Sequence, residues 1–315
     1  MRPKSNTVPT TPPRTQPSKA LLLLAGLLMP GGVLLLAWLL CRRVFPRASA
    51  QAMKRLVQLL LTAVLVQGCA TQFSSRLETS REGETPIAVP TLQFQNPSAE
   101  PAGEDAFVGA DALRPGDILL TSMPGFAAAG IELMTIAPVS HAAVYIGDGR
   151  VVEAVREGVR ERGIDALIAE ESVALVLRYP DLSRGQASRI RQYALQKIGA
   201  GFNFVGVTVQ IPYSIGRRVC ELPLVPSAVR DACIRAMGVF SQLAATERQL
   251  FCSQLVLQAF RHAGVPLTDA DPRIMSPADI LHMRDGDVPS VGIRTPLHYV
   301  GHLKYDAPRV AALER

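Results

Sequence analysis

The sequence predicts an α+β protein in which a small antiparallel sheet packs against helices. Short apolar runs, punctuated by turn residues, follow one another in the first part of the domain, as strands do. Capped helical segments then occupy blocks of their own, and such segregation is typical of α+β folds. We expect the packed domain to run from about 106 to 305, with 306–315 as a tail.

The expected strands share β-branched or aromatic content and end at turn residues. They are Ile118–Thr121, His141–Ile146, Val151–Val155, Val173–Tyr179, Val291–Arg294 and His298–Leu303. Gly147-Asp148-Gly149 predicts a hairpin turn between the second and third, and Gly158–Gly163 predicts a turn-rich edge.

Helices are predicted from cap and stop residues. The expected helices are Gly125–Ile136, one that Ser183 caps and Gly199 ends, Cys252–His262, which Gly264 ends, and one that Ser276 caps with Pro277 in its first turn. Residues 206–245 form a long, irregular and largely apolar insertion.

The net charge of +6 is unevenly distributed along the 315 residues. Residues 1–68 hold nine of the 33 Lys and Arg residues and none of the 27 Asp and Glu residues, so the remainder carries a net charge of −3. The folded part therefore offers no electrostatic case for nucleic-acid binding.

Two apolar segments precede the domain. Ala20–Cys41 is long enough to span a bilayer, whereas 53–68 has the basic start and short apolar stretch of a signal peptide. Leu65–Cys69 resembles a bacterial lipobox, with Gln67 as an unusual residue, and implies lipidation of Cys69. Ala70 follows Cys69, and no Asp stands there to favour retention in the inner membrane. We therefore expect the protein to be anchored in the outer membrane, facing the periplasm. Residues 1–52 are either a transmembrane segment or an extension upstream of a true start at Met53.

Residues 69–105 are rich in Ser, Thr, Glu, Pro and Gln. This composition predicts a flexible tether between the lipid anchor and the domain.

His141, Glu153 and Cys252 suit the parts of a thiol-catalysis site. A cysteine nucleophile needs a base, and the base needs an orienting group. With a three-residue loop, Ala143 would oppose Glu153, which would share a face with His141. With a two-residue loop, Glu153 would face away. The hairpin register therefore decides whether this site forms.

Cys252 begins a predicted helix, where free N–H groups and the helix dipole favour a thiolate. Backbone N–H groups at Cys252 and Ser253 could also hold an oxyanion. The alternative is a small buried cysteine that packs at a helix start.

The segments Arg114–Leu119, Ser140–Gly149, Val152–Ala154, Phe251–Val256 and Ser276–Ile280 carry a family resemblance. Together they resemble the circularly permuted NlpC-type papain-like enzymes, in particular the YaeF/YiiX-like permuted amidases. The order His, acidic residue, Cys is that of a permuted member. The resemblance implies a permuted papain-like fold, with a small antiparallel sheet or half-barrel on helices.

It also implies that Cys252 is the nucleophile, His141 the general base and acid, and Glu153 the group that orients the imidazole. Tyr145, Phe202 and Asn203 become candidate substrate contacts, although Phe202 lacks the hydroxyl of the tyrosine that members often carry there. The expected activity is hydrolysis of amide bonds in a cell-wall peptide or N-acyl lipid, without a cofactor. A thiol acyltransferase or esterase and an idle peptide- or lipid-binding protein remain alternatives.

The remaining candidates carry less chemistry. Cys220 and Cys233 could form a disulfide in an oxidising compartment. His298 and His302 are four apart in a predicted strand with no third ligand near in sequence, so no metal site is expected. We expect a structural role for His262, and we expect turns, not chemistry, at Asp117 and Asp148.

Overall fold

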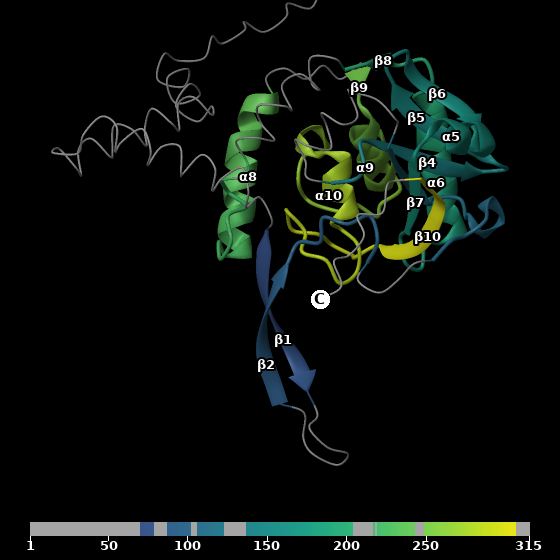
Figure 1. Cartoon of the computed structure of the whole chain (residues 1–315). Coiled ribbons are helices and arrows are strands. Elements are labelled where there is room, and N and C mark those ends of the chain that lie inside the picture. Colours follow the sequence, from purple (N-terminus) through teal and green to yellow (C-terminus); the bar gives the residue numbers. More distant parts are fainter. Residues whose placement is uncertain are drawn as a thin grey trace, which may run out of the picture.

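Figure 1 shows the protein as a computed structural model. It describes residues 70–78, 87–101, 106–122, 137–203, 217, 219–242 and 249–306. The leader, Cys69, the predicted helix Gly125–Ile136 and the tail after 306 lie outside these residues. Within the described ranges, no helix has the length and apolar character needed to cross a membrane.

A six-stranded antiparallel sheet, in the order β10-β7-β3-β4-β5-β6, forms the centre of the domain. Its strands are β3 Ile118–Ser122, β4 His141–Gly147, β5 Arg150–Val155, β6 Gly158–Gly163, β7 Val173–Arg178 and β10 His298–Tyr305. With the helices beside it, this sheet confirms the predicted α+β class. Gly158–Gly163, expected as a turn-rich edge, is instead the edge strand, because it pairs with β5 along its whole length.

Helices cover both faces of the sheet. On one face, α6 (Arg184–Gln196) and α9 (Cys252–His262) pack together over β4. The other face is covered by α5 (Ile164–Glu170), which the sequence did not predict. Alternation along β4 separates the two cores: Ala142 and Val144 join the α9 side, while Ala143 and Tyr145 join the α5 side.

The β4–β5 hairpin combines both loop lengths considered from the sequence. Gly147 pairs with Arg150 across a two-residue turn, and Asp148 and Gly149 have positive φ values of 54° and 67°, as a type I′ turn requires. The register then shifts between Tyr145 and Gly147, so that Ala143 pairs with Glu153. A β-bulge adds one residue to one strand. It restores the register that puts Glu153 on the face of His141.

The segment expected to be a flexible tether contains ordered structure. Strands β1 (Thr71–Glu78) and β2 (Ile87–Phe94) form an antiparallel hairpin that projects from the body beside α8 (Figure 1). Residues 95–100 then pack on the domain: the buried Arg284 guanidinium donates to the carbonyl oxygens of Asn96, Ser98 and Ala99 at 2.8–3.0 Å. The composition of the segment could not predict these contacts, because Arg284 lies almost 200 residues away in the sequence.

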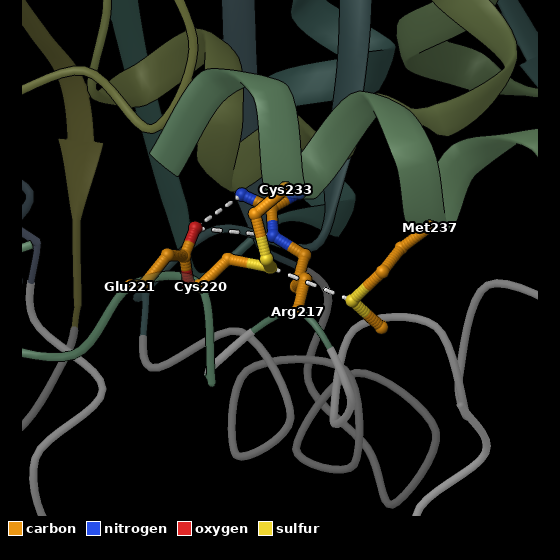
Figure 2. Close-up of a disulfide and its surroundings, with 5 residues drawn as sticks. All are labelled: Arg217, Cys220, Glu221, Cys233 and Met237. Atoms are coloured by element: carbon orange, nitrogen blue, oxygen red, sulfur yellow. Dashed lines mark hydrogen bonds and ion pairs between the residues drawn. A yellow bond between two sulfur atoms is a disulfide. The ribbon is translucent and has the colours of Figure 1, made fainter. Parts of the chain in front are cut away.

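The described part of the insertion contains α8 (Ser227–Gln242), so it is not irregular throughout. The predicted disulfide between Cys220 and Cys233 is present and joins the preceding segment to α8 (Figure 2). Arg217 donates to Glu221 Oε1 at 2.7 Å and also binds both carboxylate oxygens of Asp279. The disulfide therefore closes the insertion on itself, and the buried ion pair of Arg217 with Asp279 fixes the insertion to the domain.

Shorter elements complete the fold. They are the 3₁₀ helices Ala110–Ala112 (η1) and Pro272–Ile274 (η2), the helix α10 Pro277–Leu281, and the short parallel strands β8 Gly201–Phe202 and β9 Gln249–Leu250. The expected strand Val291–Arg294 is wrong: there, a single bridge joins Ile293 to Thr268.

Replacing both Cys220 and Cys233 with alanine should destabilise the protein by roughly 3 kcal/mol, because the disulfide closes a short loop of the unfolded chain. Urea denaturation of the variant and of the wild type, each with and without reductant, measures this. Reductant should lower the stability of the wild type alone. A variant as stable as the oxidised wild type would contradict the prediction.

Candidate active site

His141 and Glu153 lie on neighbouring strands and contact each other directly. The register places Glu153 opposite Ala143, two residues along β4 from His141. Side chains two apart in a strand share a face, and His141 Nε2 lies 2.8 Å from Glu153 Oε2. The Glu153 side chain is buried and that of His141 nearly so. The carboxylate therefore fixes the imidazole ring.

Cys252 meets His141 from the start of α9. Phe251, with extended backbone, precedes the helix, so Cys252 is its first residue. Cys252 is half-buried as a residue, and its thiol forms a hydrogen bond with His141. Because Glu153 occupies Nε2, Nδ1 is the ring nitrogen left for the sulfur. Among the described residues, Cys252 is the free cysteine.

The electrostatics of these groups favour a thiolate–imidazolium pair. Burial raises the pKa of Cys252, but the hydrogen bond and charge of His141, with the backbone N–H groups of Ala142 and Ser253, lower it overall. Burial lowers the pKa of His141, but its hydrogen bonds to Cys252 and Glu153 raise it to about 10. Such a site can hold a ready nucleophile at neutral pH.

Two arginines from β6 surround the Glu153 carboxylate. Arg160 lies opposite Glu153 in the β5–β6 ladder, and Arg162 lies two residues further on the same face. Their Nε atoms are 2.9 and 3.0 Å from Glu153 Oε1. Burial raises the pKa of Glu153, but the hydrogen bond and charge of His141 and these two arginines lower it to about 2. Glu153 is therefore ionised throughout the physiological range.

A second buried carboxylate, that of Glu171, lies close to this network. Its Oε1 is 3.9 Å from Arg162 Nη2, and Arg162 also binds Glu170 at 2.6 Å. Burial raises the pKa of Glu171, although the nearby His141 and Arg162 oppose the shift. Arg162 thus lies within ion-pair distance of three carboxylates, those of Glu153, Glu170 and Glu171.

Arg162→Met should lower turnover roughly tenfold, because Glu153 and the ring that it holds would lose a fixed partner. Arg160→Met is the matched control, because 43% of the Arg160 side chain is exposed against 12% for Arg162. Water can therefore replace more of the interaction that Arg160 makes with Glu153. Initial rates with a p-nitrophenyl ester, a generic acyl donor, measure both. Equal losses would contradict a special role for Arg162.

Hydrogen bonds hold the Cys252 segment in place. Ser253 Oγ donates to the Met275 carbonyl at 2.6 Å, and the adjoining Ser276 and Asp279 form a capping box at the start of α10. On the other side, β9 pairs with β8, and Asn203 N donates to the Leu250 carbonyl at 3.1 Å. The main chain on both sides of the sulfur is thereby fixed.

The other predicted site residues have different surroundings. Phe202 and Asn203 lie beside β9, two residues before Cys252, so they border the candidate site. Tyr145 lies four residues along β4 from His141, about 13 Å away. Its hydroxyl accepts the N–H of Gly149 at 3.0 Å, and its ring packs in the α5-side core. Tyr145 therefore supports the hairpin turn.

Two further histidines and the two turn aspartates have partners outside the site. His298 is exposed beside Asp285, whereas His302 is buried against Tyr299. Asp117 forms an ion pair with Arg178, and Asp148 forms one with Arg191. Across the residues that the structure describes, no group of three or more His, Cys, Asp or Glu residues could hold a metal ion.

Sequence reasoning missed Arg160, Arg162 and Glu171. The alternation of Arg160 and Arg162 was available as a signal, but the segment was expected to be a turn and not a strand. Glu171 follows the unpredicted α5, and no local pattern marks it as buried.

In this α+β fold, a cysteine at the start of a helix contacts a histidine–carboxylate pair. This is the arrangement found in thiol hydrolases. The chain is 32% identical over 245 residues to the Escherichia coli (strain K12) protein described as "probable lipoprotein peptidase YaeF", covering 76% of this chain and 89% of that protein. The chain therefore belongs to the family of YaeF-like lipoprotein peptidases.

No protein-family model matches the chain. Among solved structures, the metalloprotein yiiX from Escherichia coli O157:H7 matches with a TM-score of 0.36 and 15% identity, over 60% of this chain and 96% of that chain.

Proposed function

We propose that the protein is a lipid-anchored cysteine hydrolase of the bacterial cell envelope that cleaves amide bonds in a cell-wall peptide or an N-acyl lipid. The observation that carries this proposal is the contact of His141 with both Cys252 and Glu153. Membership of a lipoprotein peptidase family supports the class of reaction.

In this mechanism the Cys252 thiolate attacks the carbonyl carbon of the substrate, and a C–S bond forms. Backbone N–H groups at the start of α9, those of Cys252 and Ser253, stabilise the oxyanion. The His141 imidazolium donates its Nδ1 proton to the leaving nitrogen, and the C–N bond breaks. His141 then takes a proton from water, which attacks the thioester and releases the acid and the thiolate. Glu153 keeps the ring oriented throughout.

The lipobox-like segment that ends at Cys69 supports attachment to a membrane, and Ala70 after it supports the outer membrane, facing the periplasm. The disulfide between Cys220 and Cys233 supports an oxidising compartment as the site of folding.

The test is the pH dependence of iodoacetamide alkylation at each cysteine, followed by mass spectrometry of the corresponding peptides. Cys252 should react quickly, with a midpoint well below the ordinary thiol pKa of 9.0. The midpoint should rise in His141→Ala, because the imidazolium that stabilises the thiolate is then missing. Slow labelling with an ordinary midpoint in both proteins would leave Cys252 as a packing residue and sink the proposal.

A further inference from the structure

Exposed apolar side chains are concentrated on the β1–β2 hairpin and on the segment that leads into α8. Among the residues that the structure describes, six of the eight large hydrophobic side chains with strong exposure lie on the β1–β2 hairpin, in the segment before α8 or in the first turn of α8. They are Phe73, Leu92, Phe94, Val219, Leu224 and Val229. We call these six residues the apolar rim.

The hairpin itself is amphipathic. Phe73 pairs with Leu92 and Thr71 pairs with Phe94, so the two phenylalanines and Leu92 share one face. The paired Gln72 and Gln93 lie on the other face, exposed to solvent. Phe73 and Phe94 are 68% and 59% exposed. Two exposed phenylalanines beside a leucine on one face of a hairpin are typical of a surface that meets an apolar partner.

Leu224 presents its side chain from an unusual backbone. Its φ is +68°, in the left-handed region that disfavours leucine, and 60% of the residue is exposed. Its N–H donates to Thr71 Oγ1 at 2.8 Å, at the base of the hairpin. An exposed leucine in a strained conformation contributes little to folding, so a contact outside the described fold would account for it.

The base of the hairpin is fixed to the body. The carbonyl of Ala70 accepts Gln95 N, and the carbonyl of Thr71 accepts Arg230 Nη1, each at 2.8 Å. Arg230 Nη2 in turn donates to the Pro289 carbonyl at 3.0 Å. Ala70 and Thr71 are both buried. Cys69 immediately precedes Ala70 and can lie no more than ~7 Å from Thr71. Almost no free chain would therefore separate a lipid on Cys69 from the fixed base of the hairpin.

We propose that the apolar rim is a membrane-docking surface, which enters the headgroup–acyl boundary of the bilayer that holds the Cys69 lipid. The proposal rests on the lipid attachment proposed above and adds a fixed orientation to it. Aromatic and aliphatic side chains favour this depth of a bilayer. The short connection from Cys69 brings the rim to the bilayer instead of letting it turn freely. A bilayer is favoured over a second copy of the chain because Phe94 and Leu224 of the rim contact Thr71, two residues after the proposed point of lipid attachment.

The test uses tryptophan fluorescence of the full chain, processed in cells and reconstituted in vesicles of phosphatidylethanolamine with a minority of phosphatidylglycerol. The single tryptophan, Trp38, lies upstream of Cys69, so the wild type measures any background. Phe73→Trp places a probe on the rim. Phe107→Trp is the matched control, since Phe107 is also exposed but lies beside β10 and His302. Each protein is measured with and without bromine on the acyl chains.

A ring held ~5–10 Å within the boundary lies near the brominated carbons, so the signal of Phe73→Trp should fall by about half while that of Phe107→Trp is unchanged. An acylated Cys69 peptide and flotation with vesicles, but no quenching of Phe73→Trp, would overturn the docking surface and leave the anchor standing. Equal quenching of both probes, or a dimer that shields Phe73→Trp from lipid, would also overturn it. No acyl mass on Cys69 and no flotation would overturn the anchor and the docking surface together.

Discussion

Replacing Cys252 with serine should reduce turnover by about 10,000-fold or more while leaving the fold intact. In enzymes whose nucleophile, base and orienting group act as a unit, loss of the nucleophile costs about as much as loss of the whole set. Serine is nearly isosteric, but its hydroxyl does not ionise beside His141 as the thiol does. The start of α9 is also held by the contact of Ser253 with Met275, which the substitution does not touch.

The experiment follows p-nitrophenol release from an activated ester by wild type and variant. Wild type should show a burst of about one equivalent as the thioester forms, and the acyl mass should appear on the Cys252 peptide. Circular dichroism and thermal denaturation of the variant should match the wild type. Unchanged turnover in a folded Cys252→Ser protein would refute the nucleophile.

The sequence was sufficient to predict the local elements of the site. His141 and Glu153 could be assigned to one hairpin, and Cys252 to the first turn of a helix, because hydrophobic alternation and caps are local signals. The bulge at Ile146 was not predictable. It depends on how the hairpin twists against α6 and the rest of the sheet. The sequence is therefore compatible with a two-residue and a three-residue loop, and the structure combines them.

Features that depend on distant partners were missed. Residues 69–105 as a whole are rich in Ser, Thr, Glu, Pro and Gln, yet 71–78 and 87–100 form a hairpin and an arm that Arg284 and Arg230 hold. The arginines around Glu153 were missed because their strand, β6, was expected to be a turn. Long-range pairing and buried ion pairs leave no periodic pattern in a single sequence, so composition suggested a tether where tertiary contacts dominate.

His141→Ala should lower turnover about 1,000-fold or more, and Glu153→Gln less, by about 100-fold. The first removes the group that moves both protons, and general acid–base catalysis alone contributes about 100- to 10,000-fold. The second leaves the imidazole in place but removes the charge that orients it. The ranking is measured with the same ester at a fixed pH, and the reverse order would contradict an orienting role for Glu153.

The pH dependence separates orientation from structural damage. In wild type, activity should rise as the thiol ionises below its ordinary pKa of 9.0, and should fall again as His141 loses its proton at about 10. Without the Glu153 charge, the pKa of His141 should drop by roughly one to three units, so the alkaline limb of Glu153→Gln should move to lower pH. A merely structural role would lower the rate without moving this limb.

Stability gives an independent check on the same carboxylate. The folded-state pKa of Glu153 is lowered from 4.5 to about 2, so its ionisation stabilises the fold above pH 4.5, and this contribution is lost as the pH falls towards 2. Denaturation of wild type should show the loss across that window, whereas Glu153→Gln, which cannot ionise, should lack this component. If both proteins lost stability in parallel, the ion pairs with His141, Arg160 and Arg162 would not be the source of the acid sensitivity. The shift in the alkaline limb would then need another explanation.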